Sequence, residues 1–473
     1  MKLLIRILKI ILLVIGFLFV AILIILRIDA HGTSYLNVTN EPNTYLITNV
    51  NIVPMNQDTI LANKMVHIKD GMIQNIANNI EINDIEIIDA KNKYLTPGLI
   101  DMHVHVWDKY ELGLYLSNGV TAVRNLWGMP MHLRLKKDIK NDKIIAPMFF
   151  TTGPKLTGPE FIGDDNLQLV SQDEAKEKVI SYKNRGYDFI KTYYGLTEDL
   201  FEAIIEQTKA SDMDIVAHPS QNVPYSYHFN SQIKSIEHAE DIVQQPLNYK
   251  LDTLKLKEVI DGFANSKHSS FCPTLTVYNN IYQMLIDDNI LASEQLQFMN
   301  PLIKKVDSKA EFDRWHNTKI NDSLIVKNIM SQHDFHLKII KNLNDAGINI
   351  ICGTDAGIGI TIPGFSIHQE LLFYKKAGLS NYEVLKTATV NASKTHSSMG
   401  GIGTVEVGKI ANLILIDNNP LIDLSALQNP KTVFIKGRKL NRKTLDNYKK
   451  EARNRKNLIV SAIRYAENLI IEK

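Results

Sequence analysis

Cysteine is scarce in this chain, which has only Cys272 and Cys352 among its 473 residues. Both lie inside apolar runs typical of strands, which argues against a disulfide framework even for a domain outside the cytosol. The net charge is also small, at +2, and the sequence has no basic arm, no patch of Lys and Arg interleaved with aromatics, and no low-complexity tract. These absences argue against a nucleic-acid-binding protein.

The chain does contain enough apolar sequence for a large folded core. Hydrophobic residues make up 45% of it and charged residues 22%, which is ordinary for a globular protein. A length of 473 residues exceeds the usual size of one core. We therefore expect one large domain accompanied by a smaller one.

The N-terminal stretch "MKLLIRILKIILLVIGFLFVAILIILRIDAHG" reads as a membrane segment. Lys2, Arg6 and Lys9 precede an uncharged apolar run over residues 10–26, which is longer than a typical signal-peptide core and, with residues 3–8, approaches the ~20 residues that cross a bilayer. Bulky or charged residues fill most candidate cleavage positions in "ILRIDAHG". We predict that residues 1–30 form a retained single-pass anchor. A cleaved signal segment is the alternative, and a buried core helix is a weaker one.

The positive charges before this segment predict an orientation. They place the N-terminus in the cytoplasm and the rest of the chain on the extracytoplasmic side of the membrane. If the segment is instead cleaved, the rest of the chain would be secreted or periplasmic.

Short strands separated by turn residues occur near both ends of the chain. Between residues 44 and 92 they include a hairpin signal at Asp70-Gly71. Similar strands return in "GTVEVGKIANLILID" and "KTVFIKGRKL". We predict one small, discontinuous β-sandwich domain made of residues 44–94 and 402–440, with two unrelated β appendages as the alternative.

The middle of the chain, residues 95–401, alternates short apolar runs with helical segments. The candidate strands begin at Leu99, Val120, Pro147, Tyr187, Met213, Ile233, Ser270 and Ile348. One intervening helix opens with a Ser171 cap and Glu174 three residues later. Eight such repeats predict an α/β fold, a (β/α)8 TIM barrel. The insert at 278–336 reads as helical and is placed to roof the barrel mouth.

The final segment, residues 441–473, reads as one C-terminal helix with a mixed basic face. We expect a solvated helix that closes the fold. Contact with a membrane surface or a partner is the alternative.

Metal-ligand residue types stand where the predicted strands end. In "LTPGLIDMHVHVWD", His103 and His105 lie two residues apart, so strand geometry points both imidazoles to one face. Such a pair alone is either a packed pair or half of a metal site. The other strand ends carry Lys191, His218, His238 and Asp355. Because barrel strands converge at their carboxyl ends, we predict that these residues share one metal site, instead of each being a separate structural residue.

Several motifs together resemble the amidohydrolase superfamily, in particular its imidazolonepropionase-like and prolidase-like metal-dependent hydrolases. They are "PGLIDMHVH", "DFIKTY", "AH" at His218, "IEH" at His238, "GTDAG" and "IHQELLFYKKAGLSNYEVLKTATVNASK" followed by "GTVEVGKIANLILID". The similarity runs from Thr44 to about Lys439. It implies a (β/α)8 barrel with a discontinuous β-sandwich domain, in agreement with the strand pattern.

The resemblance also implies a ligand set. It assigns His103, His105 and Asp355 to one divalent ion, His218 and His238 to a second, and Lys191, carboxylated by carbon dioxide to a carbamate, to a bridge between them. Zn²⁺ suits these ligands best, and Mn²⁺, Fe²⁺ and Co²⁺ remain open. The two ions would lower the pKa of a shared water, and Asp355 would carry its proton to the leaving amine.

We therefore expect a binuclear amidohydrolase that cleaves a C–N bond in a small substrate such as a dipeptide or an acyl-amino acid. The side chains predicted to face the barrel mouth, for recognition or for packing, are Tyr193, Tyr225, Tyr227, Tyr278 and His368. Besides a small-molecule or short-peptide substrate and the membrane, the sequence indicates no partner. Whether the chain forms a homo-oligomer stays open.

Two other functions are weighed against this one. In a one-metal deaminase or cyclic-amide hydrolase resembling imidazolonepropionase, Lys191 would not be needed as a bridge, so its presence favours two metals. A noncatalytic scaffold typically has a damaged ligand set, whereas all six ligand positions are occupied by suitable residues here.

Overall fold

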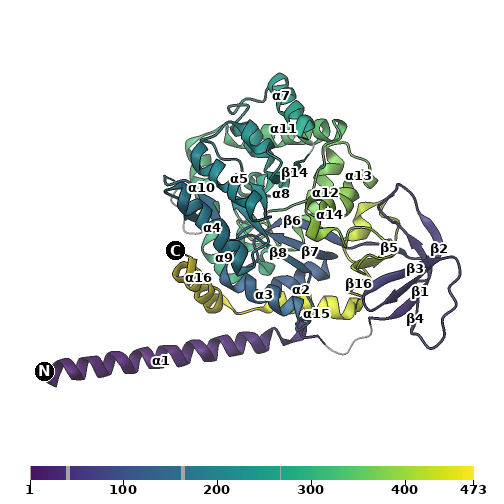
Figure 1. Ribbon diagram of the computed structural model, residues 1–473, viewed down its shortest axis with the longest axis horizontal. Coiled ribbons are helices and arrows are strands. Elements are labelled where there is room, and N and C mark those ends of the chain that lie inside the picture. Colours follow the sequence, from purple (N-terminus) through teal and green to yellow (C-terminus); the bar gives the residue numbers. More distant parts are fainter. Residues whose placement is uncertain (1, 39–42, 161–165, 267, 473) are drawn as a thin grey trace.

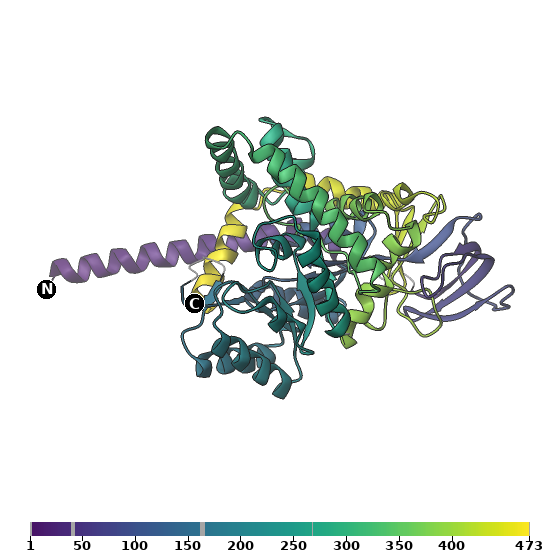
Figure 2. The same ribbon diagram turned by 90° about the horizontal axis from the view of Figure 1, so that it is seen from above.

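The computed structural model describes residues 2–38, 43–160, 166–266 and 268–472. Helices pack around parallel strands to form the body of the molecule (Figure 1). A β-rich region lies at one end, and the N-terminal helix projects from the other, as Figure 2 shows from above. The predicted α/β class is therefore confirmed.

One sheet combines strands from both ends of the chain. Its described strands are β1 Tyr45–Ile52, β2 Leu61–Lys69, β3 Met72–Ala77, β4 Ile87–Asp89, β5 Tyr94–Pro97, β15 Leu413–Ile416, β16 Thr432–Ile435 and β17 Arg438–Asn441. They run in the order β17-β16-β15-β5-β1-β2-β3, with β4 beside β1, and β15 pairs antiparallel with β5. The predicted hairpin is confirmed, because β2 and β3 pair antiparallel around Asp70 and Gly71, whose φ angles of 51° and 77° suit a tight turn.

Parallel strands form two further sheets. The smaller one holds β6 Leu99–Val104, β7 Val120–Asn125 and β8 Met148–Thr151, and the larger one holds β9 Lys155–Thr157, β10 Asn166–Gln168, β11 Phe189–Thr192, β12 Asp214–Ala217, β13 Ile233–Glu237 and β14 Ser270–Cys272. Isolated parallel bridges join Thr152 to Phe189, Phe271 to Ile350 and Val104 to Ala356. These bridges link the two sheets at both ends, which gives a TIM-barrel-like arrangement.

The segment predicted as the eighth strand, which begins at Ile348, pairs only through isolated bridges. Ile351 N donates to Phe271 O at 2.9 Å, and Cys352 O accepts from Met102 N at 2.8 Å, so the segment still lies between β14 and β6. The prediction of a regular strand is therefore wrong here, because the segment takes the place of the eighth strand but forms only isolated bridges with its neighbours. The sequence reading also missed β9 and β10, which are only three residues long each.

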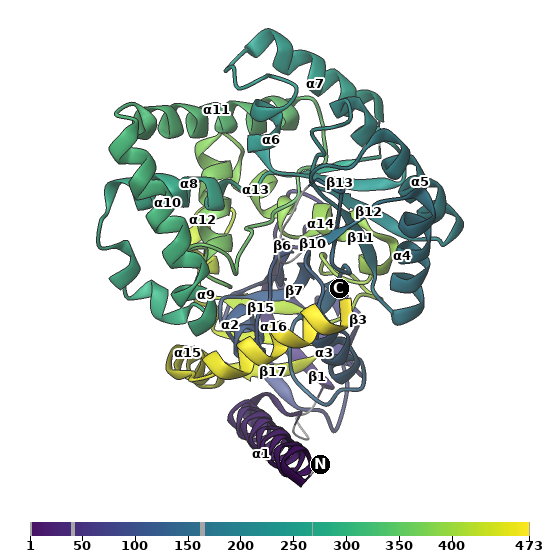
Figure 3. The ribbon, with the colours of Figure 1, turned by 90° about the vertical axis from the view of Figure 1, so that its left-hand side faces the viewer.

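Helices surround the parallel strands, as the view from the side of the N-terminal helix shows (Figure 3). Their bounds are α2 Lys109–Ser117, α3 Pro130–Lys140, α4 Gln172–Arg185, α5 Glu198–Ala210, α6 Ala239–Gln244, α7 Thr253–Ser266, α8 Leu275–Ile286, α9 Pro301–Lys305, α10 Asp307–Asn321, α11 Ile325–Asp345, α12 Ser366–Lys376, α13 Asn381–Thr387 and α14 Val390–Thr395. The predicted helical insert is thus confirmed as α8 to α11. Helix α4 begins as predicted, since Ser171 Oγ accepts from Glu174 N at 3.2 Å.

Helix α1, Lys2–Gly32, lies outside the body for most of its length (Figure 1). The stretch Leu3–Gly32 is long and apolar enough to cross a membrane, and its most apolar part is not buried in the fold. A signal sequence near the N-terminus would pass the same test. The helix therefore fits both the predicted anchor and the cleaved-segment alternative.

The C-terminal segment forms two helices, α15 Arg442–Asn454 and α16 Leu458–Glu472, where the sequence predicted one. The break occurs where Arg455 and Asn457 turn inward. Arg455 Nη1 donates to Asp108 Oδ1 at 3.1 Å, and Asn457 Nδ2 donates to Asp108 Oδ2 at 2.8 Å. The expectation of a solvated helix is wrong for α16, which packs against α3 and α9 and brings Tyr465 to the central cavity.

Candidate metal centre

A cavity of about 800 Å³ opens at the carboxyl ends of the parallel strands. Its lining includes all of the residues predicted as metal ligands: His103, His105, Lys191, His218, His238 and Asp355. Each of them is at most 6% exposed. The strands thus bring together residues that are separated by as much as half of the chain.

His103, His105 and Asp355 form the first part of this group. Asp355 Oδ1 lies 2.7 Å from His105 Nε2 and 3.2 Å from His103 Nε2. The two histidines point the same way because they are two residues apart at the end of β6. The left-handed backbone at Asp355 belongs to the same turn that places its carboxylate beside them.

His218, His238 and Lys191 complete the group. The ring centroid of His238 lies 4.5 Å from that of His218 and 4.9 Å from that of His103. Among the described residues, neither ring nitrogen of His218 makes a hydrogen bond, although Nε2 lies 3.3 Å from Asp241 Oδ2, and Lys191 Nζ makes none either. Buried polar atoms are rarely left without a partner in folded proteins, so these atoms fit a site that binds a cation.

Three triads have the spacing of a metal site among the described residues, and two of them share His238. His103, His238 and Asp355 each offer one ligand atom, and these atoms lie within 4.8 Å of one another. The same holds for His218, His238 and Asp241. Because His238 belongs to both triads, the geometry suits either one ion or two neighbouring ions.

Burial sets the charge states of these side chains. It lowers the pKa of His103 to about 4 and holds the pKa values of His218 and His238 well below their usual range. It also lowers the pKa of Lys191 to about 8. Burial by itself would raise the pKa of Asp355, but the neighbouring histidines, His103 foremost, outweigh it and hold that pKa well below its usual value. Neutral imidazoles and an ionised carboxylate are the forms that bind divalent cations.

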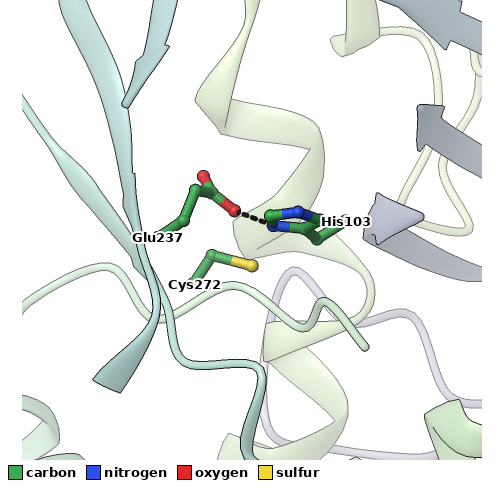
Figure 4. A group of neighbouring side chains, drawn as sticks. All are labelled: His103, Glu237 and Cys272. Atoms are coloured by element: carbon green, nitrogen blue, oxygen red, sulfur yellow. Dashed lines mark hydrogen bonds and ion pairs between the residues drawn. The ribbon is translucent and has the colours of Figure 1, made fainter. Parts of the chain in front are cut away.

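Two further side chains, those of Glu237 and Cys272, lie beside His103, as Figure 4 shows. Glu237 Oε2 pairs with His103 Nδ1 at 2.7 Å, and the Cys272 thiol faces the same side chains. Burial raises the pKa of Cys272 well above its usual value, so it stays a thiol at neutral pH. Since Glu237 occupies Nδ1, His103 is left with Nε2 for the cavity.

Of the residues predicted to contact substrate, Tyr193 lines the cavity. Its ring centroid lies 4.3 Å from that of His218. Lys155 Nζ lies 4.5 Å from the centre of the Tyr193 ring, which is the geometry of a cation–π contact. Tyr193 is therefore within reach of a molecule bound beside the histidines.

The other four residues predicted to face the mouth lie elsewhere, so those predictions are wrong about position. Tyr225 is buried beside a neighbouring pocket, and Tyr227 donates to Glu198 at the surface. Tyr278 packs against histidines of α11, and His368 Nε2 pairs with a backbone carbonyl at 3.1 Å. Closeness to a strand end in the sequence misled the prediction, because each of these residues stands on a helical turn that points its side chain away from the cavity.

Several lining residues were missed by the sequence reading. Trp107 and Trp127 lie with their ring centroids 4.7 Å apart, and since each closely follows a predicted strand, its position was a usable signal. Lys155 stands on the short strand β9. Glu240 follows His238 by two residues and also lines the cavity. Tyr465 comes from α16, and nothing in its local sequence connects it to the cavity.

One wall of the cavity is apolar. Helix α8 contributes Val277, Ile281 and Met284, and the chain around α9 contributes Leu302, Ile303 and Val306. The residues predicted as metal ligands line the same cavity at the strand ends. A molecule bound in the cavity would therefore contact both polar and apolar side chains.

Comparisons with known proteins agree with this geometry. A family model described as "Amidohydrolase family" matches residues 190–440, just over half of the chain. Ochratoxinase of Aspergillus niger is 34% identical over 102 residues, which make up 21% of this chain and 20% of that protein. The match to this curated relative thus spans only a fifth of its length.

Two solved structures share the fold. Bottromycin amidohydrolase superposes with a TM-score of 0.71 at 22% identity, over 88% of this chain and 91% of that one. A Xaa-Pro dipeptidase with methionine bound in its active site superposes with a TM-score of 0.65 at 18% identity, over 84% of this chain and 100% of that one. At these identities the likeness concerns the fold alone.

Proposed function

The chain belongs to the amidohydrolase family of metal-dependent hydrolases, and we propose that it uses two divalent ions to hydrolyse a C–N bond in a dipeptide or an acyl-amino acid. Lys191 carries this proposal. Its Nζ is buried among the histidines, at 1% residue exposure, with no hydrogen-bond partner among the described residues. A bare buried amine costs stability, whereas a carboxylated Lys191 would offer its two oxygens as ligands for cations held by the neighbouring histidines.

The described side chains fit such a pair of ions. One ion would be held by His103, His105 and Asp355, the second by His218 and His238, with the carboxylated Lys191 between them. Carbamate formation joins Lys191 Nζ to the carbon of carbon dioxide and releases a proton from Nζ, so it needs the neutral amine that a pKa of about 8 makes accessible. Zn²⁺ suits these nitrogen and oxygen ligands. When bound, such ions polarise an amide carbonyl and lower the pKa of water.

Asp355 has the properties of the residue that moves the proton. Its carboxylate is ionised at neutral pH and lies on the cavity floor, 2.7 Å from His105 Nε2. We infer that it accepts a proton from the attacking water and delivers it to the nitrogen of the leaving amine. The reaction then needs no other proton donor in the cavity.

The lining of the cavity supports the substrate class. The wall that includes Ile281, Met284 and Val306 suits the hydrocarbon part of an acyl group or an apolar amino-acid side chain. The charged residues of the same lining include Lys155 and Arg314 as well as Glu240, Asp307 and Glu311. The carboxylate of an amino acid would lie beside one of the two positive side chains. A substrate with one apolar group and one carboxylate matches both features.

We also propose the finer architecture expected from the sequence. The parallel strands and bridges support a closed (β/α)8 barrel within residues 95–401, and the sheet shared by β1 to β5 and β15 to β17 supports a composite β-sandwich domain of residues 44–94 and 402–440. The exposed apolar surface of α1 supports a single-pass anchor. The positive charges before the apolar run favour an extracytoplasmic position for the barrel. An anchored chain should stay in the membrane fraction after an alkaline carbonate wash, whereas a cleaved one should be released.

Hydrolysis assays test the proposed reaction. The full chain, purified in detergent with Zn²⁺ and bicarbonate, is offered Xaa-Pro dipeptides and N-acyl amino acids from acetyl to lauroyl, and release of the free amine is followed. Lys191→Ala should lose most turnover. The matched variant Lys338→Ala removes an exposed lysine of α11 and should behave like the wild type. Full turnover in Lys191→Ala would instead favour a one-metal deaminase or cyclic-amide hydrolase.

A further inference from the structure

Arg124 is a fully buried side chain, at 0% exposure, in the interior of the barrel-like body. Its guanidinium uses three nitrogens. Nε donates to Met102 O at 2.6 Å, Nη1 donates to Ser235 Oγ at 2.9 Å, and Nη2 donates to Glu237 Oε1 at 2.9 Å. Interiors of this kind are usually filled by branched apolar side chains, so a buried ion pair here requires an explanation.

Glu237 connects this arginine to the metal-ligand cluster. Its Oε1 accepts from Arg124, and its Oε2 accepts from His103 Nδ1 at 2.7 Å (Figure 4). Ser235 Oγ also donates to Glu237 Oε1, so this oxygen already faces two donors. The carboxylate therefore acts as an acceptor, and Oε2 pairs with His103 through a proton on Nδ1.

The chain of contacts continues on the far side of Arg124. His396 Nε2 lies 2.9 Å from Arg124 Nη1, and His396 Nδ1 lies 2.7 Å from Asp214 Oδ2. Since the guanidinium can only donate, His396 must accept at Nε2 and donate from Nδ1 to Asp214. Asp214 stands at the amino end of β12, with its side chain 24% exposed, whereas His218 follows the carboxyl end of the same strand.

Stability alone does not account for this arrangement. Taking an arginine and a glutamate out of water costs several kcal/mol per ion, and apolar residues of similar size often serve a core equally well or better. The ion pair instead fixes the tautomer of His103, because it determines which ring nitrogen carries the proton. With Nδ1 protonated, the lone pair of His103 Nε2 points to Asp355 and the cavity, 3.2 Å from Asp355 Oδ1.

We propose that Arg124 and Glu237 are positioning residues for the metal centre, which hold His103 in the one tautomer and orientation that present Nε2 to a metal ion. The His396 and Asp214 pair extends the same hydrogen-bonded chain to the opposite end of β12 and holds Arg124 in place. The inference rests on the proposed metal site but not on the identity of the substrate. Carboxylates that orient ligand histidines in this way tune metal affinity in other proteins.

Glu237→Gln tests the inference. The glutamine amide keeps the size of the side chain but offers one acceptor and one donor, so an NH₂ group must face either Arg124 or His103. If the NH₂ group faces Arg124, two donors point at each other. If it faces His103, Nδ1 must accept, so the proton of His103 moves to Nε2. The matched control is Glu472→Gln, which breaks another largely buried pair, with Arg185 Nη1 at 2.6 Å, away from the ligand residues.

Zn²⁺ affinity of the full chain is measured by competition with a chromophoric chelator, and the visible absorption of the Co²⁺-loaded protein reports on ligand geometry. We expect Glu237→Gln to bind Zn²⁺ about 10- to 100-fold more weakly and to change the Co²⁺ spectrum, whereas Glu472→Gln should match the wild type in both. Wild-type affinity and spectrum in Glu237→Gln would overturn the inference while leaving the proposed function intact. A wild-type chain that binds no metal would overturn both.

A double variant keeps the test decisive if the single variant folds poorly. Arg124→Met combined with Glu237→Met replaces the ion pair with apolar side chains of similar size. We expect its ion-free form to unfold at the same or a higher urea concentration than the wild type, with Zn²⁺ affinity still reduced. A less stable double variant that binds Zn²⁺ as tightly as the wild type would show that the pair only stabilises the core.

Discussion

Removing the amine of Lys191 should stabilise the ion-free protein even as it destroys the metal site. Lys191→Met replaces a buried amine with an apolar side chain of similar length. Burial lowers the pKa of Lys191 from 10.5 to about 8, because the protonated form is poorly solvated inside the cavity. In the absence of metal and carbon dioxide, the wild-type chain must therefore either keep a buried charge or give up a proton in order to fold.

The sign and size of the effect follow from the two pKa values. The unfolded chain holds the proton more tightly, so stability rises with pH between about 8 and 10.5, and the cost is fully present below about 8. At roughly 1.4 kcal/mol per pKa unit, the cost is about 3 kcal/mol at pH 7 and about 1 kcal/mol at pH 10. Lys191→Met should be more stable than the wild type by these amounts.

Urea unfolding of the full chain in detergent, with a chelator and carbon-dioxide-free buffer, measures the difference at both pH values. Lys338→Met, at an exposed position of α11, serves as the control and should track the wild type at each pH. The reasoning is refuted if Lys191→Met is no more stable than the wild type at pH 7, or if its advantage is the same at pH 7 and pH 10.

Three further substitutions and one treatment are predicted to act on separate parts of the molecule. Asp355→Asn should keep at least one metal ion per chain but lose about 10²- to 10⁴-fold in turnover, because it removes the carboxylate that we propose carries the proton. Val306→Asp, on the exposed rim of the apolar wall, should raise KM for a lauroyl-amino acid about tenfold and leave KM for an acetyl-amino acid nearly unchanged. Asp108→Ala should cost about 1–3 kcal/mol in urea unfolding, since it removes the nearer of the two carboxylates of the buried Arg455 and leaves Asn457 without its acceptor. Chelation should abolish turnover, and Zn²⁺ with bicarbonate should restore it.

Each of these expectations has a contrary outcome. Wild-type turnover in Asp355→Asn would remove its assigned role, and an equal change of KM for both acyl lengths in Val306→Asp would remove the apolar wall from substrate recognition. Unchanged stability in Asp108→Ala would mean that Arg455 finds other partners. Turnover that survives chelation would argue against metal catalysis altogether.

The meeting of the strand-end residues in one cavity was the most predictable part of the site. Residues at the carboxyl ends of parallel strands meet on one face whatever the loops between them do, and the structure lines one cavity with His103, Lys191 and Asp355 for this reason. The hairpin at Asp70-Gly71 was equally local, because only a few residue pairs allow its backbone angles.

The positions that the sequence did not predict depend on long-range packing. Tyr278 and Tyr465 are both tyrosines on helices, yet the structure turns the first toward α11 and the second into the cavity. The break between α15 and α16 depends on Asp108, which lies more than 300 residues earlier in the chain. Helical periodicity contains no information about such partners, so it predicted one continuous helix.

The number of metal ions per chain tests the central claim most directly. The full chain would be loaded with Zn²⁺ in the presence of bicarbonate, freed of excess metal and analysed by elemental mass spectrometry beside Lys191→Ala. Two ions in the wild type and no more than one in the variant is the result that a lysine-bridged pair predicts. One ion in both proteins would contradict the bridge and indicate single-metal chemistry, and no ion in either would contradict the metal site itself.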